Sequence, residues 1–290
     1  MTRGRLAGIV AAVVAAAVAG VVVAGRGTGS PVAAAATKSA NAGGAHLALS
    51  VDVQSPKLAG GKELHVTGSG VVDQSSADVT VDLGSLLGAV KAPANAPSSI
   101  HAILVRQSGD ELAFVHLTPM PALTGGKGWV ELDLSKLASA HGVDLGGLAA
   151  GSSAMTPSQV LDLLRSSGAG VTNLGSATVA GASTTHYRVL VDLAELAKAA
   201  GIPQTTAGRL GKGPAATTKV PVNVWIGTDG LVHRVQAAYT LHHNGSSAHA
   251  AFTLTLSDYG TSVSISPPAS SDVFDVTSFL TQSGGIRPFS

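Results

Sequence analysis

Strict alternation of apolar and polar side chains constrains the fold of this chain more than any other feature. The alternation occurs in residues 46–53, 78–83 and 252–257, and in the last segment Phe252 and Leu254 are each followed by a threonine. A period of two places one set of side chains in a core and the other in water, which is typical of antiparallel sheets. Similar patterns predict further strands near residues 63–72, 100–106, 110–117, 128–133, 171–179, 185–192, 220–227, 231–241 and 261–266.

Turn residues separate these segments, and helix signals are few. Asp229-Gly230 predicts a hairpin. The strongest helix signal begins at the capping residue Thr156, with Pro157 at the first helical position, and ends before Gly168. Other helices are predicted over residues 193–200 and, more weakly, 133–141 and 271–281, while residues 83–90 fit a strand end or a short helix. This mixture predicts an α+β fold, a curved antiparallel half-barrel sheet with helices packed over its concave apolar face.

The first 26 residues predict export. Arg3 and Arg5 precede an unbroken run of small apolar residues, Leu6 to Gly25, which Arg26 ends. A basic start followed by an apolar run is typical of a signal peptide, and its length also matches the roughly 20 residues that a membrane span needs. We therefore expect an extracytoplasmic protein, either anchored in the membrane by residues 6–25 or secreted after cleavage.

Composition excludes several functional classes. The formal net charge is only +1, so a nucleic-acid partner is not expected, because neutralising phosphates requires a dense basic surface. The chain has no Cys, which removes disulfides, Cys-ligated zinc, iron–sulfur clusters and thiol catalysis.

No catalytic or metal-binding pattern stands out. The G-x-S-x-G motif is absent, and residues 211–213 (Gly-Lys-Gly) lack the Ser or Thr that follows the lysine of a phosphate loop. His242, His243 and His249 flank a turn, but adjacent strand residues point to opposite faces, so we do not expect them to converge on a metal. The sequence predicts a non-enzyme with no catalytic residues, metal or cofactor.

Three stretches within residues 157–275 carry a family resemblance. After a predicted helix, they have the patterns V..LG..TV.G..TTHYR.LVDL, VWIGTDGLVHRV and D.G..V.I..PP, in that order. Together they resemble actinobacterial envelope lipoproteins of the LppX/LprG kind, which share a fold with the lipoprotein carrier LolA. Residues 45–133 resemble the family less specifically, through GSGVVD at 68–73 and GKGWVELDL at 126–134.

The resemblance implies an apolar cavity between sheet and helices that holds the acyl chains of an envelope lipid or lipoglycan, without catalysis. One departure concerns anchoring. The family usually carries an acylated Cys after the signal, whereas Arg26 stands there in this chain, so an acyl anchor is excluded. The candidate lining residues are Val160, Leu161 and Leu164 on the covering helix and Val189, Val191, Val224, Phe252 and Leu254 on the sheet.

The sequence divides into four predicted segments. Residues 1–26 are a signal peptide or anchor, 27–44 a low-complexity tether, 45–282 one LppX/LprG-like lipid-binding domain and 283–290 a tail. The alternative to a carrier is a membrane-tethered sensor or scaffold that recognises a protein partner. A carrier requires a cavity, while a scaffold requires a closed core and an exposed apolar patch.

The His186-Tyr187-Arg188 triplet predicts two different surfaces. Alternation directs Tyr187 and Val189 inward and His186 and Arg188 toward solvent. Arg188 and Arg234 are candidates for contact with a lipid headgroup, and ordinary solvated strand charges are the alternative.

Overall fold

The computed structural model describes residues 30–54, 63–90, 97–116, 124–136, 171–192, 219–243 and 246–282. The strands of the first half are β1 (Gly44–Gln54), β2 (Glu63–Val72), β3 (Ser76–Asp82), β4 (Ser99–Gln107), β5 (Asp110–His116) and β6 (Trp129–Asp133). Those of the second half are β7 (Val171–Val179), β8 (Ala182–Asp192), β9 (Lys219–Gly227), β10 (Val232–His243), β11 (Ser246–Thr261) and β12 (Val273–Asp275). The described helices are α2 (Pro31–Ala40), α3 (Gly84–Val90), the short 3-10 helix η2 (Ser270–Asp272) and α10 (Thr277–Gln282).

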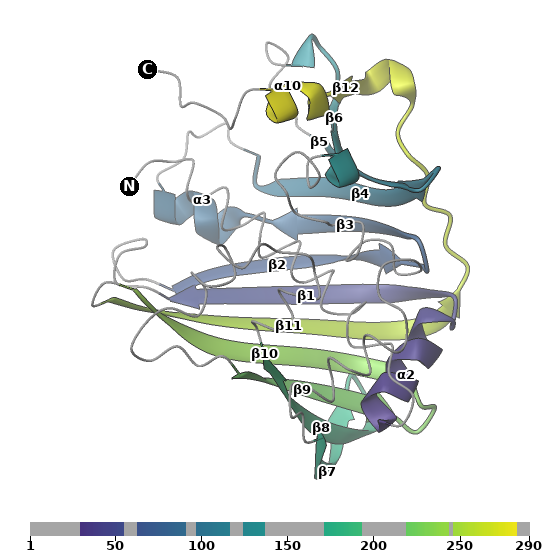
Figure 1. Ribbon diagram of the computed structural model, residues 1–290, viewed down its shortest axis with the longest axis vertical. Helices are drawn as coiled ribbons and strands as arrows, with labels where there is room; N and C mark the ends of the chain where they lie inside the picture. The colour runs from purple at the N-terminus through teal and green to yellow at the C-terminus, as the bar shows by residue number, and fades with distance from the viewer. Residues whose placement is uncertain are drawn as a thin grey trace.

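All twelve strands form one sheet, in the order β12-β6-β5-β4-β3-β2-β1-β11-β10-β9-β8-β7 (Figure 1). Neighbouring strands are antiparallel except β12 and β6, which are parallel. In the described residues β12 and β7 occupy opposite edges, so the sheet is open. The predicted α+β class with a large antiparallel sheet is confirmed.

The pairing of β1 with β11 joins the two halves of the chain. Leu49 of β1 faces Gly68 of β2 on one side and Leu254 of β11 on the other. Strands distant in sequence therefore meet at the middle of the sheet, while the strands on each side follow one another as hairpins. The apolar sets of both halves thereby lie on one continuous surface.

We call the side that carries Leu49, Leu254 and Val224 the inner face, and the opposite side the outer face. Two clusters of buried side chains occupy the inner face. The first spans β3, β2, β1 and β11 and includes Val79, Val81 and Leu256, and the second spans β8, β9 and β10. The alternation in the sequence therefore predicted correctly which side chains are buried in the central strands.

Two glycines on the inner face of β2 allow the sheet to bend. A Cβ at Gly70 would lie 1.9 Å from the carbonyl oxygen of Asp78, and one at Gly68 would lie 3.1 Å from Leu49 Cγ. No side chain fits the first of these spaces, so the close approach of β2 to β3 requires glycine at position 70.

A separate core lies on the outer face near β4, β5 and β6. Ile103, Val105 and Phe114 are buried there against Val273 of β12, with Ile265 packed beside them. Ile103 pairs with Phe114 and with Asp78, which places it opposite the inner-face residues of β3. Both faces of β4 are thus partly covered, because Ile265 and Val273 pack on the outer side. They belong to the stretch that runs from β11 past the ends of the strands to β12 (Figure 1).

Three local predictions were wrong. The expected tether at 27–44 contains α2, whose Val32, Ala33, Ala35 and Ala36 are buried, and residues 44 onward already belong to β1. The helix expected over 271–281 is divided into η2, β12 and α10, because backbone pairing with β6 takes residues 273–275. The strand expected over 261–266 does not extend beyond Thr261, where β11 ends.

One alternative for residues 83–90 is confirmed, and two predicted helices lie where the structure is not described. Residues 84–90 form α3, which was one of the two alternatives for that stretch. The helices predicted over 157–167 and 193–200 lie outside the described residues, as do residues 1–29. Among the helices that the structure describes, none is long and apolar enough to cross a membrane.

Candidate functional site

The inner face is built from rows of paired apolar residues that cross the sheet. Pairing connects Val224 of β9 to Val235 of β10, then to Leu254 of β11 and Leu49 of β1. Val224 and Leu254 are each only 1% exposed. A neighbouring row consists of Val189, Val222, Ala237, Phe252, Val51 and Val66.

Side chains in these rows are apolar and uncharged, and most of them are valines. Gly68 and Gly70 have no side chain, and Ala237 faces the half-buried Phe252 across the strand pair. On the other side of the first cluster Ala102 pairs with Val79. Such a surface can contact hydrocarbon through dispersion and the hydrophobic effect, and it offers no polar side chain at these positions for covalent chemistry.

The structure brings together the predicted sheet residues of the site. Val189, Val224, Phe252 and Leu254 all lie on the inner face, and the register places Val191 on the same face opposite Val220. The predicted helix residues Val160, Leu161 and Leu164 lie outside the described residues. Contact of any of these side chains with a ligand stays a prediction.

Sequence reasoning missed the contribution of α2 to this face. Val32, Ala35 and Ala36 of the helix pack with Val189 and Val224 in the second inner cluster. A signal was available, since Pro31 occupies the first turn and the three apolar residues have helical spacing.

Hydrogen bonds fasten α2 to β10 and β11. The backbone N–H of Val232 donates to Ser39 Oγ at 2.8 Å, while the Ser39 hydroxyl donates to the carbonyl of Ala35. The hydroxyl of Tyr259 in turn donates to the carbonyl of Val232. Burial raises the pKa of Tyr259 to about 12. These bonds hold the helix over one end of the apolar rows.

The outer face of β8, β9 and β10 carries a second group of side chains. The rings of His186 and Trp225 are stacked, with centroids 4.2 Å apart and an interplanar angle of 6°. Asn223 Oδ1 accepts from Arg188 Nε at 3.2 Å and lies 3.0 Å from His186 Nε2. The guanidinium of Arg234 lies 5.8 Å from the Trp225 ring centroid. The predicted outward direction of His186 and Arg188 is confirmed by the register, which pairs Tyr187 with Val224 on the inner face.

Acidic side chains gather at the other end of the sheet, around β5, β6 and β12. Asp133 is 2% exposed and accepts from the backbone N–H of Lys136, while its Oδ2 lies 2.7 Å from Lys136 Nζ. Burial raises the pKa of Glu111, and the charge of Arg106 partly opposes that rise. Burial also raises the pKa of Glu131, with the charges of Asp275 and Asp133 acting in the same direction.

Histidine–aspartate pairs on the outer face are separate from one another. His65 pairs with Asp52, His101 with Asp78 at 2.6 Å, and His233 with Asp229 at 3.0 Å. Within the described part of the chain no group of three or more His, Asp or Glu is placed to hold a metal ion. Of the three histidines considered for a metal, His249 lies 3.3 Å from Thr240 Oγ1.

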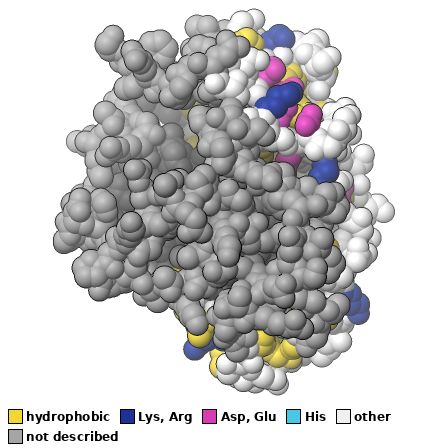
Figure 2. Space-filling view, viewed as in Figure 1, with side chains coloured by type: hydrophobic (Ala, Val, Ile, Leu, Met, Phe, Trp, Pro, Cys, Tyr) yellow, Lys and Arg dark blue, Asp and Glu magenta, His cyan; other side chains and the backbone are white. Residues whose placement is uncertain are grey.

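The space-filling view shows how the described side chains reach the surface. Hydrophobic side chains are exposed at the end of the molecule that carries α2, β8 and β7 in Figure 1, and basic and acidic side chains lie side by side at the opposite end (Figure 2). The two ends of the sheet therefore differ in surface chemistry. Fold and site define an α+β protein whose open antiparallel sheet presents a continuous aliphatic face.

A curated relative shows the family. The chain is 30% identical over 273 residues to an uncharacterized 31.2 kDa protein of the rplA–rplJ intergenic region of Streptomyces griseus. The aligned residues cover 89% of this chain and 83% of the relative. The chain belongs to the family of that Streptomyces protein. No family model matches the chain.

Solved structures with similarity to this chain include two mycobacterial lipoproteins. Lipoprotein LppX of Mycobacterium tuberculosis has a TM-score of 0.44 and 15% identity, with 79% of this chain and 95% of that chain covered. LprF of Mycobacterium bovis has a TM-score of 0.36 and 13% identity, with 81% and 93% covered.

Proposed function

We propose that this protein binds an acylated lipid or lipoglycan in the cell envelope, holds its hydrocarbon chains against the inner face, and does so without catalysis. The observation that carries the proposal is the set of uncharged aliphatic rows that cross β8, β9, β10, β11, β1 and β2. Residues 30–282 form the binding domain, with α2 included in it, and residues 1–26 act as export signal or anchor.

Energetics support hydrocarbon as the cargo. Each buried methylene contributes roughly 0.8 kcal/mol, so one or two long acyl chains offset the loss of translational and rotational freedom on binding. Alanine at position 237 adds less side-chain volume to the inner face than leucine or phenylalanine would. A flexible chain fits such an irregular surface by changing its rotamers.

Native mass spectrometry of the full chain after mild extraction tests the proposal directly. We expect a bound mass that matches a lipid, and uptake of a fluorescently labelled diacyl phospholipid by the delipidated protein. A chain that emerges without lipid and does not take up the probe would contradict lipid binding and favour a scaffold with a closed core.

A matched pair of substitutions locates the binding surface. Ala237 lies on the inner face opposite Phe252, and its neighbour Ala238 is exposed on the outer face. The indole of Ala237→Trp should keep at least two methylenes of the bound chain off the sheet, which weakens probe binding by about 1.6 kcal/mol or more, about fifteenfold at the least. Ala238→Trp, with the same change in volume, should leave binding unchanged. Circular dichroism confirms that both variants fold, and equal affinities would argue against the inner face.

A further inference from the structure

The outer face of β8, β9 and β10 carries an unusual grouping of arginine and aromatic side chains. We define the arginine–tryptophan patch as His186, Arg188, Asn223, Trp225 and Arg234. We propose that this patch docks the domain on a bilayer surface that contains anionic phospholipid. The inference deepens the proposed function and rests on it for its biological purpose, because a lipid carrier has to meet a membrane to load or unload.

The patch is preorganised by its own contacts. Asn223 Oδ1 accepts from Arg188 Nε, and this hydrogen bond fixes the guanidinium beside β9 without using its two terminal nitrogens. Arg234 donates from Nε to Thr255 Oγ1 at 3.4 Å and lies over one side of Trp225. Arginines fixed in this way lose little side-chain entropy when they bind phosphate, and their planar ends match its oxygens.

Charge favours an anionic partner. Arg188 on β8 and Arg234 on β10 flank β9, at strand positions roughly 10 Å apart across the sheet. None of the described side chains on the outer face of β8, β9 and β10 is acidic. Among the described side chains of this face, no acidic group therefore cancels the positive potential of the patch.

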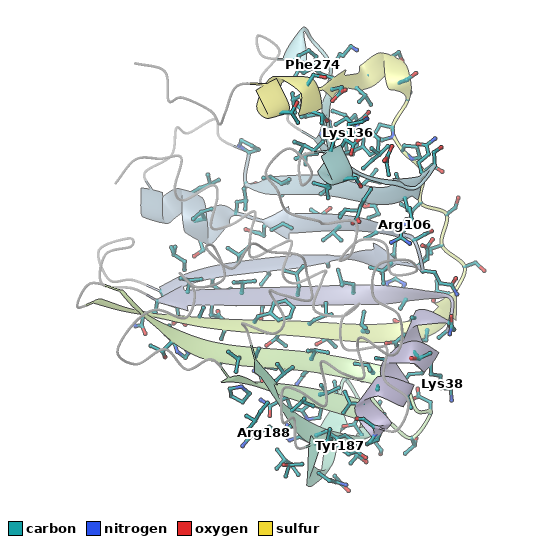
Figure 3. All side chains as sticks on the ribbon, in the orientation of Figure 1. Lys38, Arg106, Lys136, Tyr187, Arg188 and Phe274 are labelled. Carbon is teal, nitrogen blue, oxygen red and sulfur yellow. The ribbon has the colours of Figure 1, made fainter. Side chains whose placement is uncertain are left out.

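Apolar neighbours distinguish a membrane from a soluble anion. Leu190 lies two residues after Arg188 on the same face and is 39% exposed, and Leu174 of the adjacent edge strand β7 is 42% exposed. Tryptophan, arginine and exposed leucine together are the residues that enter the interfacial zone of a bilayer. Figure 3 shows Arg188 and Tyr187 on opposite sides of β8 at this end of the sheet, so docking through Arg188 leaves the inner face free.

Chain connectivity places the patch near the membrane if residues 6–25 are retained as an anchor. Only residues 26–30 connect that run to α2, which begins at Pro31, and five residues span at most about 18 Å. α2 packs against the inner side of β9 and β10, the strands whose outer side carries the patch. A tethered domain would therefore present this end of the sheet, rather than the β6 end, to the bilayer.

Arginine footprinting of the full chain tests the proposal. The unsubstituted chain is reconstituted with vesicles of phosphatidylcholine alone or mixed with phosphatidylglycerol, treated with phenylglyoxal, and mapped by mass spectrometry. We expect Arg188 and Arg234 to be protected only by the anionic vesicles, and the protection to disappear at high salt. Arg106 lies on β4, which the strands β3, β2, β1 and β11 separate from β10, so it is the internal control and should react equally in all vesicles.

Substitution of a single arginine tests whether docking depends on the charge of the patch. Each basic residue at an anionic surface contributes about 1 kcal/mol, so Arg234→Gln should lower the ratio of docked to free domain about fivefold and reduce the protection of Arg188 accordingly. Arg106→Gln, a matched loss of charge, should leave that protection unchanged.

Several outcomes would overturn docking. Equal protection in neutral and anionic vesicles would remove the electrostatic argument, and protection in neither would show that the patch does not face a bilayer. Protection only in native membranes that contain protein would assign the patch to a protein partner. Uptake of the labelled phospholipid is measured in the same preparations to keep the two proposals separate. Uptake without arginine protection would overturn docking alone, and protection without uptake would overturn lipid binding alone.

Discussion

Glu111 and Tyr259 are ionisable side chains that the fold withdraws from water, and each gives a prediction at the scale of single residues. Glu111 Oε2 is buried without a hydrogen-bond partner in the described residues. Its raised pKa means that the folded state retains the carboxyl proton more strongly than the unfolded state does. The contribution of Glu111 to stability therefore falls as pH rises through its ordinary pKa and then its raised pKa.

Replacing this carboxylate should stabilise the protein at neutral pH. Glu111→Gln removes the charge that burial disfavours, so we expect a higher urea midpoint than the wild type at pH 7 and a difference that shrinks in acid. Urea denaturation at several pH values measures this. Glu63→Gln, at an exposed position at the start of β2, serves as the control and should change little. A lower midpoint for Glu111→Gln at neutral pH would contradict the prediction.

Replacing Tyr259 should destabilise the protein, in contrast to the replacement of Glu111. Its hydroxyl donates to Val232, so Tyr259→Phe leaves that carbonyl short of a partner and should cost roughly 1–2 kcal/mol of unfolding free energy. Since the folded pKa is about 12 and the ordinary value 10.0, the wild type should lose stability between these pH values as tyrosinate forms in the unfolded state. Denaturation in alkali should show this slope in the wild type and a smaller one in the variant.

At the scale of elements, α2 is part of the domain and not a linker. Ala36 is buried against the sheet, while Ala34 on the same helix is exposed. Ala36→Asp would bury a carboxylate without a partner, and we expect a loss of roughly 2–4 kcal/mol in unfolding free energy and faster proteolysis near residue 40. Ala34→Asp should change stability by less than about 0.5 kcal/mol. Equal stabilities would show that the helix does not dock in solution.

The strands of the sheet were largely predictable, and the reason is local. Residues 63–72 have the same bounds in the prediction and in β2, which begins with alternating exposed and buried residues, and β9 and β10 flank the hairpin expected at Asp229-Gly230. A strand with one face in water must alternate, so its pattern records its burial directly. The same alternation correctly placed the predicted sheet residues of the site on one face.

Burial that depends on elements distant in the sequence was not predictable. The strand β4 was expected, but it contains apolar residues in both phases, and Ile103 and Val105 are buried because Phe114, Val273 and Ile265 pack on the outer face. α2 consists mostly of alanine, serine and threonine, a composition that fits a linker equally well until a surface of the right shape lies against it. β12 has three residues and exists because β6 offers it a free edge.

For the whole molecule, binding and stability should be coupled. A ligand that binds only the folded chain adds about 2.7 kcal/mol to the unfolding free energy at a hundred times its Kd. We therefore expect a long-chain diacyl phospholipid to raise the melting temperature of the wild type and of Ala238→Trp, and to raise that of Ala237→Trp much less. Calorimetry with a short-chain, water-soluble phospholipid as control separates hydrocarbon binding from headgroup binding. No shift for any lipid would contradict the proposed function.

Alternation, turn residues and the apolar N-terminal run are written into consecutive residues, because each reflects whether a local segment meets water, a turn or a bilayer. The identity of neighbouring strands is not determined by consecutive residues in this way. Many strands here share the same apolar pattern and are interchangeable as partners, so the junction of β1 with β11, the docking of α2 and the convergence of Arg188 with Arg234 around Trp225 arise only when the complete sheet is assembled.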